Sequence, residues 1–97
     1  MCKSEIFAEI LRIVSRETEI STSDILSNNK EAEVVDARYL LVHLLYEHGF
    51  YPSQIASHVR KTKRSINYIL SNFSDRLQSG KMLRIQYENI KKLQGNH

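Results

Sequence analysis

The most informative segment of the chain is residues 53–70, which read SQIASHVRKTKRSINYIL. Pro52 favours a helix start, and a short apolar face follows from Ile55 to Val59. Thr62 can cap a second, longer helix. The apolar stripe of that helix consists of Ile66, Ile69, Leu70, Phe73 and Leu77. A short helix, a tight turn and a longer helix are typical of a helix-turn-helix motif, which we expect over about residues 53–78.

The turn of this motif has one unusual residue. The motif needs a small side chain where its two helices cross, and Ala56 supplies it. Many such turns contain glycine, whereas this turn contains Arg60. We therefore expect Arg60 to adopt a right-handed or otherwise tolerated backbone conformation.

Basic residues are concentrated in the second half of the chain. Residues 1–49 contain five Lys or Arg against nine acidic residues, whereas residues 50–97 contain nine against two. Four of the nine fall within five positions, at the turn and the start of the second helix. They are Arg60, Lys61, Lys63 and Arg64. Such a cluster creates a positive potential that attracts phosphate, although a solvated helix face would have the same composition.

The location of the cluster favours DNA binding. In a helix-turn-helix the first residues of the second helix face base edges in the major groove of duplex DNA. Arg and Lys suit the acceptors of guanine, and Asn suits adenine. We predict contacts with double-stranded DNA by Arg60, Lys61, Thr62, Lys63, Arg64, Ser65, Asn67 and Tyr68.

The remaining segments also have helical periodicity. Ser4 is expected to cap a first helix that fades near Glu17, and Ser21 precedes a short helical turn. The inner stripe of the first helix is predicted to contain Ile6, Phe7, Ile10, Leu11 and Val14. Residues 28–33 read as a polar loop.

Two further helices complete the prediction. Asp36 is expected to cap an apolar helix over residues 37–48, which Gly49 ends in a left-handed conformation. A last helix begins near Lys81, with an inner face of Met82, Leu83, Ile90 and Leu93. Because no segment alternates with period two, we predict one all-α domain of five or six helices.

On these residues the chain resembles the C-terminal DNA-binding domain of the bacterial replication initiator DnaA, over nearly its whole length. The resemblance covers residues 20–27 (ISTSDILS), then Val34, Val35 and Arg38, and residues 87–90 (YENI). Residues 60–66 (RKTKRSI) correspond to the family's Gly-Gly-basic turn and Asp-His-Thr-Thr-Val helix start. The resemblance implies a helical, sequence-specific and regulatory DNA-binding protein. Because the chain lacks a GxxxxGK[ST] phosphate loop, we expect it to act without a nucleotide-hydrolysing domain.

Arg38 is predicted to reach DNA from outside the motif. We expect it at the start of an apolar helix, where a cation is unfavourable beside the positive end of the helix dipole. In the resembled family the matching Arg enters the minor groove. The chain departs from the family at residues 28–33 (NNKEAE), where the family has a basic loop. We therefore expect a preferred DNA site that differs from the initiator's own binding box.

Composition excludes several other functions. With 97 residues the chain has room for one small core, and a lone Cys2 forms neither an internal disulfide nor a cysteine zinc site. The longest apolar run, residues 39–42, is far shorter than the roughly 18 residues of a membrane span. We expect a soluble, cytoplasmic protein, monomeric or weakly dimeric, without a cofactor or metal.

Histidines give no catalytic pattern. His43 and His48 are five residues apart, so they do not share a helix face as metal ligands at i and i+4 do. His58 is expected to be solvated. With no nucleophile and base at recognisable spacing, we expect no enzyme activity.

The alternative function is a protein–protein interaction module that uses the helix-turn-helix only as a scaffold. Its surface would be the acidic first half, the last helix, or an aromatic patch of Tyr39, Tyr46, Phe50 and Tyr51. A salt-dependent DNA titration separates this module from a DNA-binding protein.

Overall fold

Six helices and no strand are present in residues 2–94, the part of the chain that this computed structural model describes. This confirms the predicted all-α class. The helices are α1 (Lys3–Thr18), α2 (Thr22–Ile25), α3 (Ala32–Glu47), α4 (Pro52–Val59), α5 (Lys63–Ser79) and α6 (Lys81–Gln94). None of them is long and apolar enough to cross a membrane.

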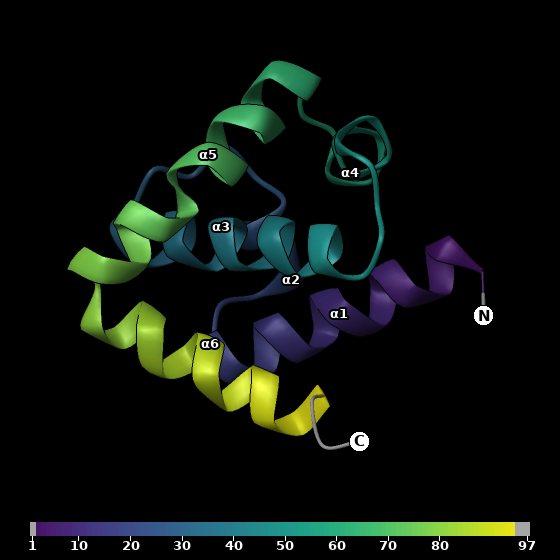
Figure 1. Cartoon of the computed structure of the whole chain (residues 1–97). Coiled ribbons are helices and arrows are strands. Elements are labelled where there is room, and N and C mark those ends of the chain that lie inside the picture. The colour runs from purple at the N-terminus through teal and green to yellow at the C-terminus, as the bar shows by residue number, and fades with distance from the viewer. Residues whose placement is uncertain (1, 95–97) are drawn as a thin grey trace.

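Helix α3 lies at the centre of the molecule and packs against each of the other five helices (Figure 1). Its leucines Leu40, Leu41, Leu44 and Leu45 are fully buried. They meet the predicted stripes of α1 and α5, including Val14 and Ile66. Truncating a leucine at such a position typically costs about 2–5 kcal/mol, so the buried leucines of α3 contribute strongly to stability.

Several helix boundaries follow local signals that the sequence predicts. The hydroxyl of Ser21 accepts a hydrogen bond from Asp24 N at 3.1 Å and caps α2. Pro52 is the first residue of α4, and Thr62 caps α5. Gly49 follows α3 with a φ of 90°, the left-handed conformation expected there. Helix α1 begins one residue before the expected cap, Ser4.

The start of α3 differs from the prediction. Asp36 does not cap this helix, because α3 begins at Ala32, inside the segment expected to be a polar loop. The side chain of Asn29 explains the earlier start, since its Oδ1 accepts a hydrogen bond from Glu31 N at 2.8 Å. Asp36 instead lies on the second turn and accepts a 2.6 Å hydrogen bond from Arg76 Nε of α5.

The inner face of α6 also differs from the prediction. Leu83 and Ile90 are buried, but Met82 and Leu93 are exposed. Tyr87 completes the inner row, because positions 83, 87 and 90 follow the spacing of one helix face. Met82 and Leu93 lie off that row, and their exposure leaves part of α6 without an apolar partner.

Candidate nucleic-acid interface

Helices α4 and α5 are joined by a turn of three residues, 60–62, as the motif requires. Ala56 is buried, as expected for the small residue where the two helices approach. The apolar residues predicted to fill the crossing are buried as well. They are Ile55, Val59, Ile66 and Ile69.

Arg60 adopts the left-handed conformation that we expected this turn to avoid. Its φ and ψ are 59° and 45°, and Lys61 N donates a 3.0 Å hydrogen bond back to Ala56 O. This is the αL ending that helices usually build with glycine. A left-handed residue with a side chain costs about 1–2 kcal/mol, so the turn carries backbone strain at an exposed arginine.

The N-terminus of α5 is open and positively charged. Thr62 Oγ1 accepts a hydrogen bond from Ser65 N at 3.0 Å. The N–H groups of Lys63 and Arg64 have no protein acceptor in residues 2–94, and no acid lies in the first turn. Free N–H groups and the positive end of the helix dipole together bind anions such as phosphate.

The side chains at this end of α5 point to solvent. Lys63, Arg64, Ser65, Asn67 and Tyr68 are all exposed, as is Thr62. Within residues 2–94, neither Lys63 nor Arg64 forms an ion pair with a carboxylate, and the same holds for Arg60. Three of the four predicted phosphate-binding cations therefore remain available to a ligand.

The ammonium group of the fourth cation, Lys61, already donates hydrogen bonds to protein oxygens. Its Nζ donates to Asn28 Oδ1 at 2.6 Å and to Ser27 O at 3.0 Å. Partial burial lowers the pKa of Lys61, and the nearby charges of Arg38 and Lys30 lower it further. This lysine connects the turn to the α2–α3 loop, so its role includes holding the two segments together.

Arg38 does not occupy the position from which a minor-groove contact was predicted. It lies on the second turn of α3, not at its start, and is only 6% exposed. Its Nε donates to Ile25 O at 2.8 Å, and its two terminal nitrogens donate to Asn29 O and Asp24 O. Burial lowers the pKa of Arg38. The guanidinium thus satisfies carbonyls at the end of α2, which is the structural reason for an arginine here.

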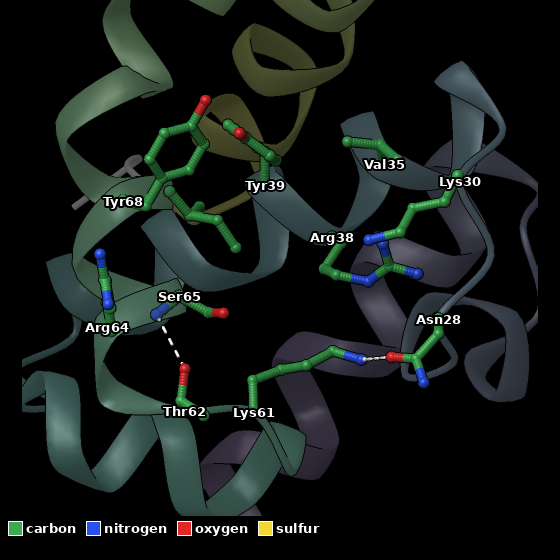
Figure 2. A pocket seen from close by; sticks show the side chains of 11 residues that line it. Asn28, Lys30, Val35, Arg38, Tyr39, Lys61, Thr62, Arg64, Ser65 and Tyr68 are labelled. Carbon is green, nitrogen blue, oxygen red and sulfur yellow. Dashed lines mark hydrogen bonds between the residues drawn. The ribbon is translucent and has the colours of Figure 1, made fainter.

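A groove of about 490 Å³ lies between the start of α5 and the α2–α3 loop (Figure 2). Four cations line it, Lys30, Arg38, Lys61 and Arg64, and none of its lining residues is acidic. Lys30 was missed in the sequence because it stands beside Glu31 and Glu33. The structure places Lys30 in the α2–α3 loop, across the groove from Arg64, which is 34 residues later in the chain.

His58 and part of the predicted aromatic patch pack inside the fold. His58 is half-buried rather than solvated, and its ring stacks on Phe7 with centroids 4.9 Å apart. The aromatic patch of the alternative function is not formed as predicted. Tyr39 and Phe50 belong to the core, and only Tyr46 and Tyr51 are exposed.

His43 also packs against an aromatic ring. It stacks on Phe73 at 3.9 Å between centroids, and its Nε2 lies 3.2 Å from Glu47 Oε2. The described residues contain no group of three or more His, Cys, Asp or Glu arranged to hold a metal ion.

Comparisons of the chain with protein-family models, with curated proteins and with solved structures found no match. The resemblance to the DnaA family therefore stays a prediction from the residues quoted above.

Proposed function

We propose that this protein binds duplex DNA, with α4 and α5 acting as a helix-turn-helix and α5 entering the major groove. The observation that carries the proposal is the open N-terminus of α5, where Arg60, Lys63 and Arg64 are exposed and have no carboxylate partner in residues 2–94. Unpaired cations at a helix N-terminus favour phosphate binding.

The exposed face of α5 supplies groups suited to base edges. Arg64, Asn67 and Tyr68 are spaced at i, i+3 and i+4, so they share one face of the helix. This face lies away from the buried row that includes Ile66 and Ile69. We assign Asn67 to a base contact, because its amide pairs bidentately with adenine, and leave Arg64 at the edge of this face to a phosphate.

The basic groove beside α5 is assigned to the DNA backbone. A phosphate between Lys30 and Arg64 meets cations from both walls and no acid among the lining residues. Lys61 and Arg38 add positive potential while their nitrogens remain bonded to protein oxygens. Backbone contacts of this kind fix the position of α5 on the duplex but carry no sequence information.

The resemblance to the DnaA domain supports a regulatory, sequence-specific role. Residues 62–65 differ from the family's helix start, which supports a preferred DNA sequence different from the initiator's box. A wrong base pair typically costs about 1–3 kcal/mol, so four altered positions are enough to change the preferred site. Binding selection from a random duplex library tests this. We expect an enriched site that differs from the initiator's box, and recovery of only random sequence would contradict specific binding.

A further inference from the structure

A second groove is lined in part by the first half of α6, which follows the far end of α5 from the turn 60–62; Figure 1 shows the start of α6 beside the end of α5. It has a volume of about 700 Å³ and is formed by the end of α1, the start of α3 and the first half of α6. Met82 and Ile85 contribute apolar surface to it and are 64% and 41% exposed. Apolar side chains grouped in a groove on a small domain are typical of an interaction surface.

The walls of this groove are acidic. Its lining contains Glu17, Glu19, Glu33 and Asp36, and no Lys or Arg. Asp36 is paired with Arg76, and Glu17 accepts a hydrogen bond from Asn89 at 2.9 Å. Glu19 and Glu33 are exposed and have no ion pair within residues 2–94. The groove therefore combines exposed apolar side chains with the carboxylates of Glu19 and Glu33, which are free to meet a cation.

We infer that this acidic groove docks a basic amphipathic segment of a partner protein. One or two aliphatic side chains of that segment cover Met82 and Ile85, while Lys or Arg on either side meets Glu19 and Glu33. Charge complementarity selects the partner, because the groove repels acidic chains and nucleic acid alike. The chain's own basic surface, at the start of α5, is the surface proposed for DNA, so a second copy is a poorer fit than a separate partner.

The lining of this groove shares no residue with the basic groove at the start of α5. A carboxylate-lined groove is also unsuited to face DNA. The docking inference does not depend on the proposed function, and DNA-free protein is sufficient to test it.

A synthetic probe tests the groove with the full chain. The probe is a 14-residue helical peptide of Leu and Lys with leucines at i, i+3, i+4 and i+7, and its counterpart with Glu in place of Lys is the control. In two-dimensional NMR spectra of the isotope-labelled protein, we expect saturable shifts confined to residues 17–20, 33–36 and 82–86. The Glu peptide should cause none.

Lysine substitutions inside and outside the groove locate the contact, and Glu9→Lys is the charge-matched control for Glu33→Lys. Ile85→Lys and Glu33→Lys should each weaken binding of the Lys peptide by about tenfold, equivalent to about 1.4 kcal/mol. Glu9→Lys makes the same charge change at an exposed acid of α1 outside the groove and should change affinity less than about twofold. Circular dichroism should show unchanged helix content in all three, and Met82→Lys replaces Ile85→Lys if that variant loses structure.

Three outcomes overturn the inference. The first is the absence of saturable shifts, and the second is shifts spread equally over acids outside the groove. The third is self-association of the unliganded protein that Ile85→Lys abolishes in sedimentation, which would identify a second copy as the occupant.

Discussion

Lys61 Nζ lies 2.6 Å from Asn28 Oδ1, a hydrogen bond between residues 33 positions apart. The same ammonium donates to Ser27 O at 3.0 Å. Because Lys61 is in the turn before α5 and Asn28 is in the loop before α3, this contact joins two segments that line the basic groove. A residue predicted to bind phosphate thus has a structural role in shaping the surface.

Replacing Lys61 should therefore destabilise the fold. In Lys61→Met the apolar stem is kept, but the hydrogen bonds to Ser27 and Asn28 are lost. We expect the free energy of unfolding to fall by about 1–2 kcal/mol in urea titrations. Lys63→Met is the matched control, since Lys63 is exposed and makes no such bond. Equal stability of the two variants would contradict the role assigned to Lys61.

Arg60 is expected to lower the free energy of unfolding while strengthening DNA binding. Arg60→Gly removes the penalty of a left-handed residue and should raise the free energy of unfolding by about 0.5–1 kcal/mol, after the entropy cost of glycine. The same substitution should weaken DNA binding, because it removes a cation. Glu19, whose φ is 60°, is the control. Glu19→Gly should also stabilise the protein without weakening DNA binding, and weakened binding there would contradict the placement of the DNA surface.

Arg38 is expected to stabilise the fold, whatever DNA sequence the protein binds. Arg38→Met leaves three carbonyls without their charged donor, and we expect a loss of about 2–4 kcal/mol in unfolding free energy. Arg38→Lys should recover only part of it, because one ammonium cannot match the planar guanidinium. A variant that unfolds like the wild type but loses affinity only on A·T-rich flanks would contradict this structural role and favour the predicted minor-groove contact.

His43 should make stability depend on pH. Burial is the main effect on its pKa and lowers it, while the carboxylate of Glu47 acts in the opposite direction. The unfolded chain binds a proton near pH 6.5, whereas the folded protein resists protonation. The free energy of unfolding should therefore fall as pH decreases from 7.5 to 5.5.

The variant His43→Phe isolates this effect. It keeps a ring against Phe73 but does not titrate, so its unfolding free energy should vary less over the same pH range. Urea titrations at several pH values measure the difference. An identical pH dependence in wild type and variant would show that His43 does not contribute.

Local signals explain which parts of the fold the sequence predicts. Ser21, Pro52 and Thr62 act within three or four residues of their own position, so the starts of α2, α4 and α5 were predictable. The start of α3 was not, because its polar first turn resembles a loop and Asn29 supports the backbone from outside the helix.

The candidate site was predictable only along α5. The exposure of Lys63 and Arg64 follows from the apolar stripe of that helix. The burial of Arg38 depends on carbonyls of α2 and of the loop that follows it, 9 to 14 residues earlier in the chain. Lys30 faces Arg64 only after α2, α3 and α5 have packed together, so no spacing in the sequence indicates it.

Salt-dependent binding of duplex DNA, measured by fluorescence anisotropy, tests the central claim most directly. If Lys30, Arg60, Lys63 and Arg64 neutralise four phosphates, log K should fall with log salt at a slope of about −3.6. The variant Lys63→Ala/Arg64→Ala should lose most of the affinity, reduce the slope by about 1.8 and keep its helix content. Lys81→Ala/Lys92→Ala removes the same charge from exposed positions of α6 and should keep the wild-type slope. No binding at low salt, binding that salt does not affect, or equal losses in the two double variants would contradict DNA recognition by α5.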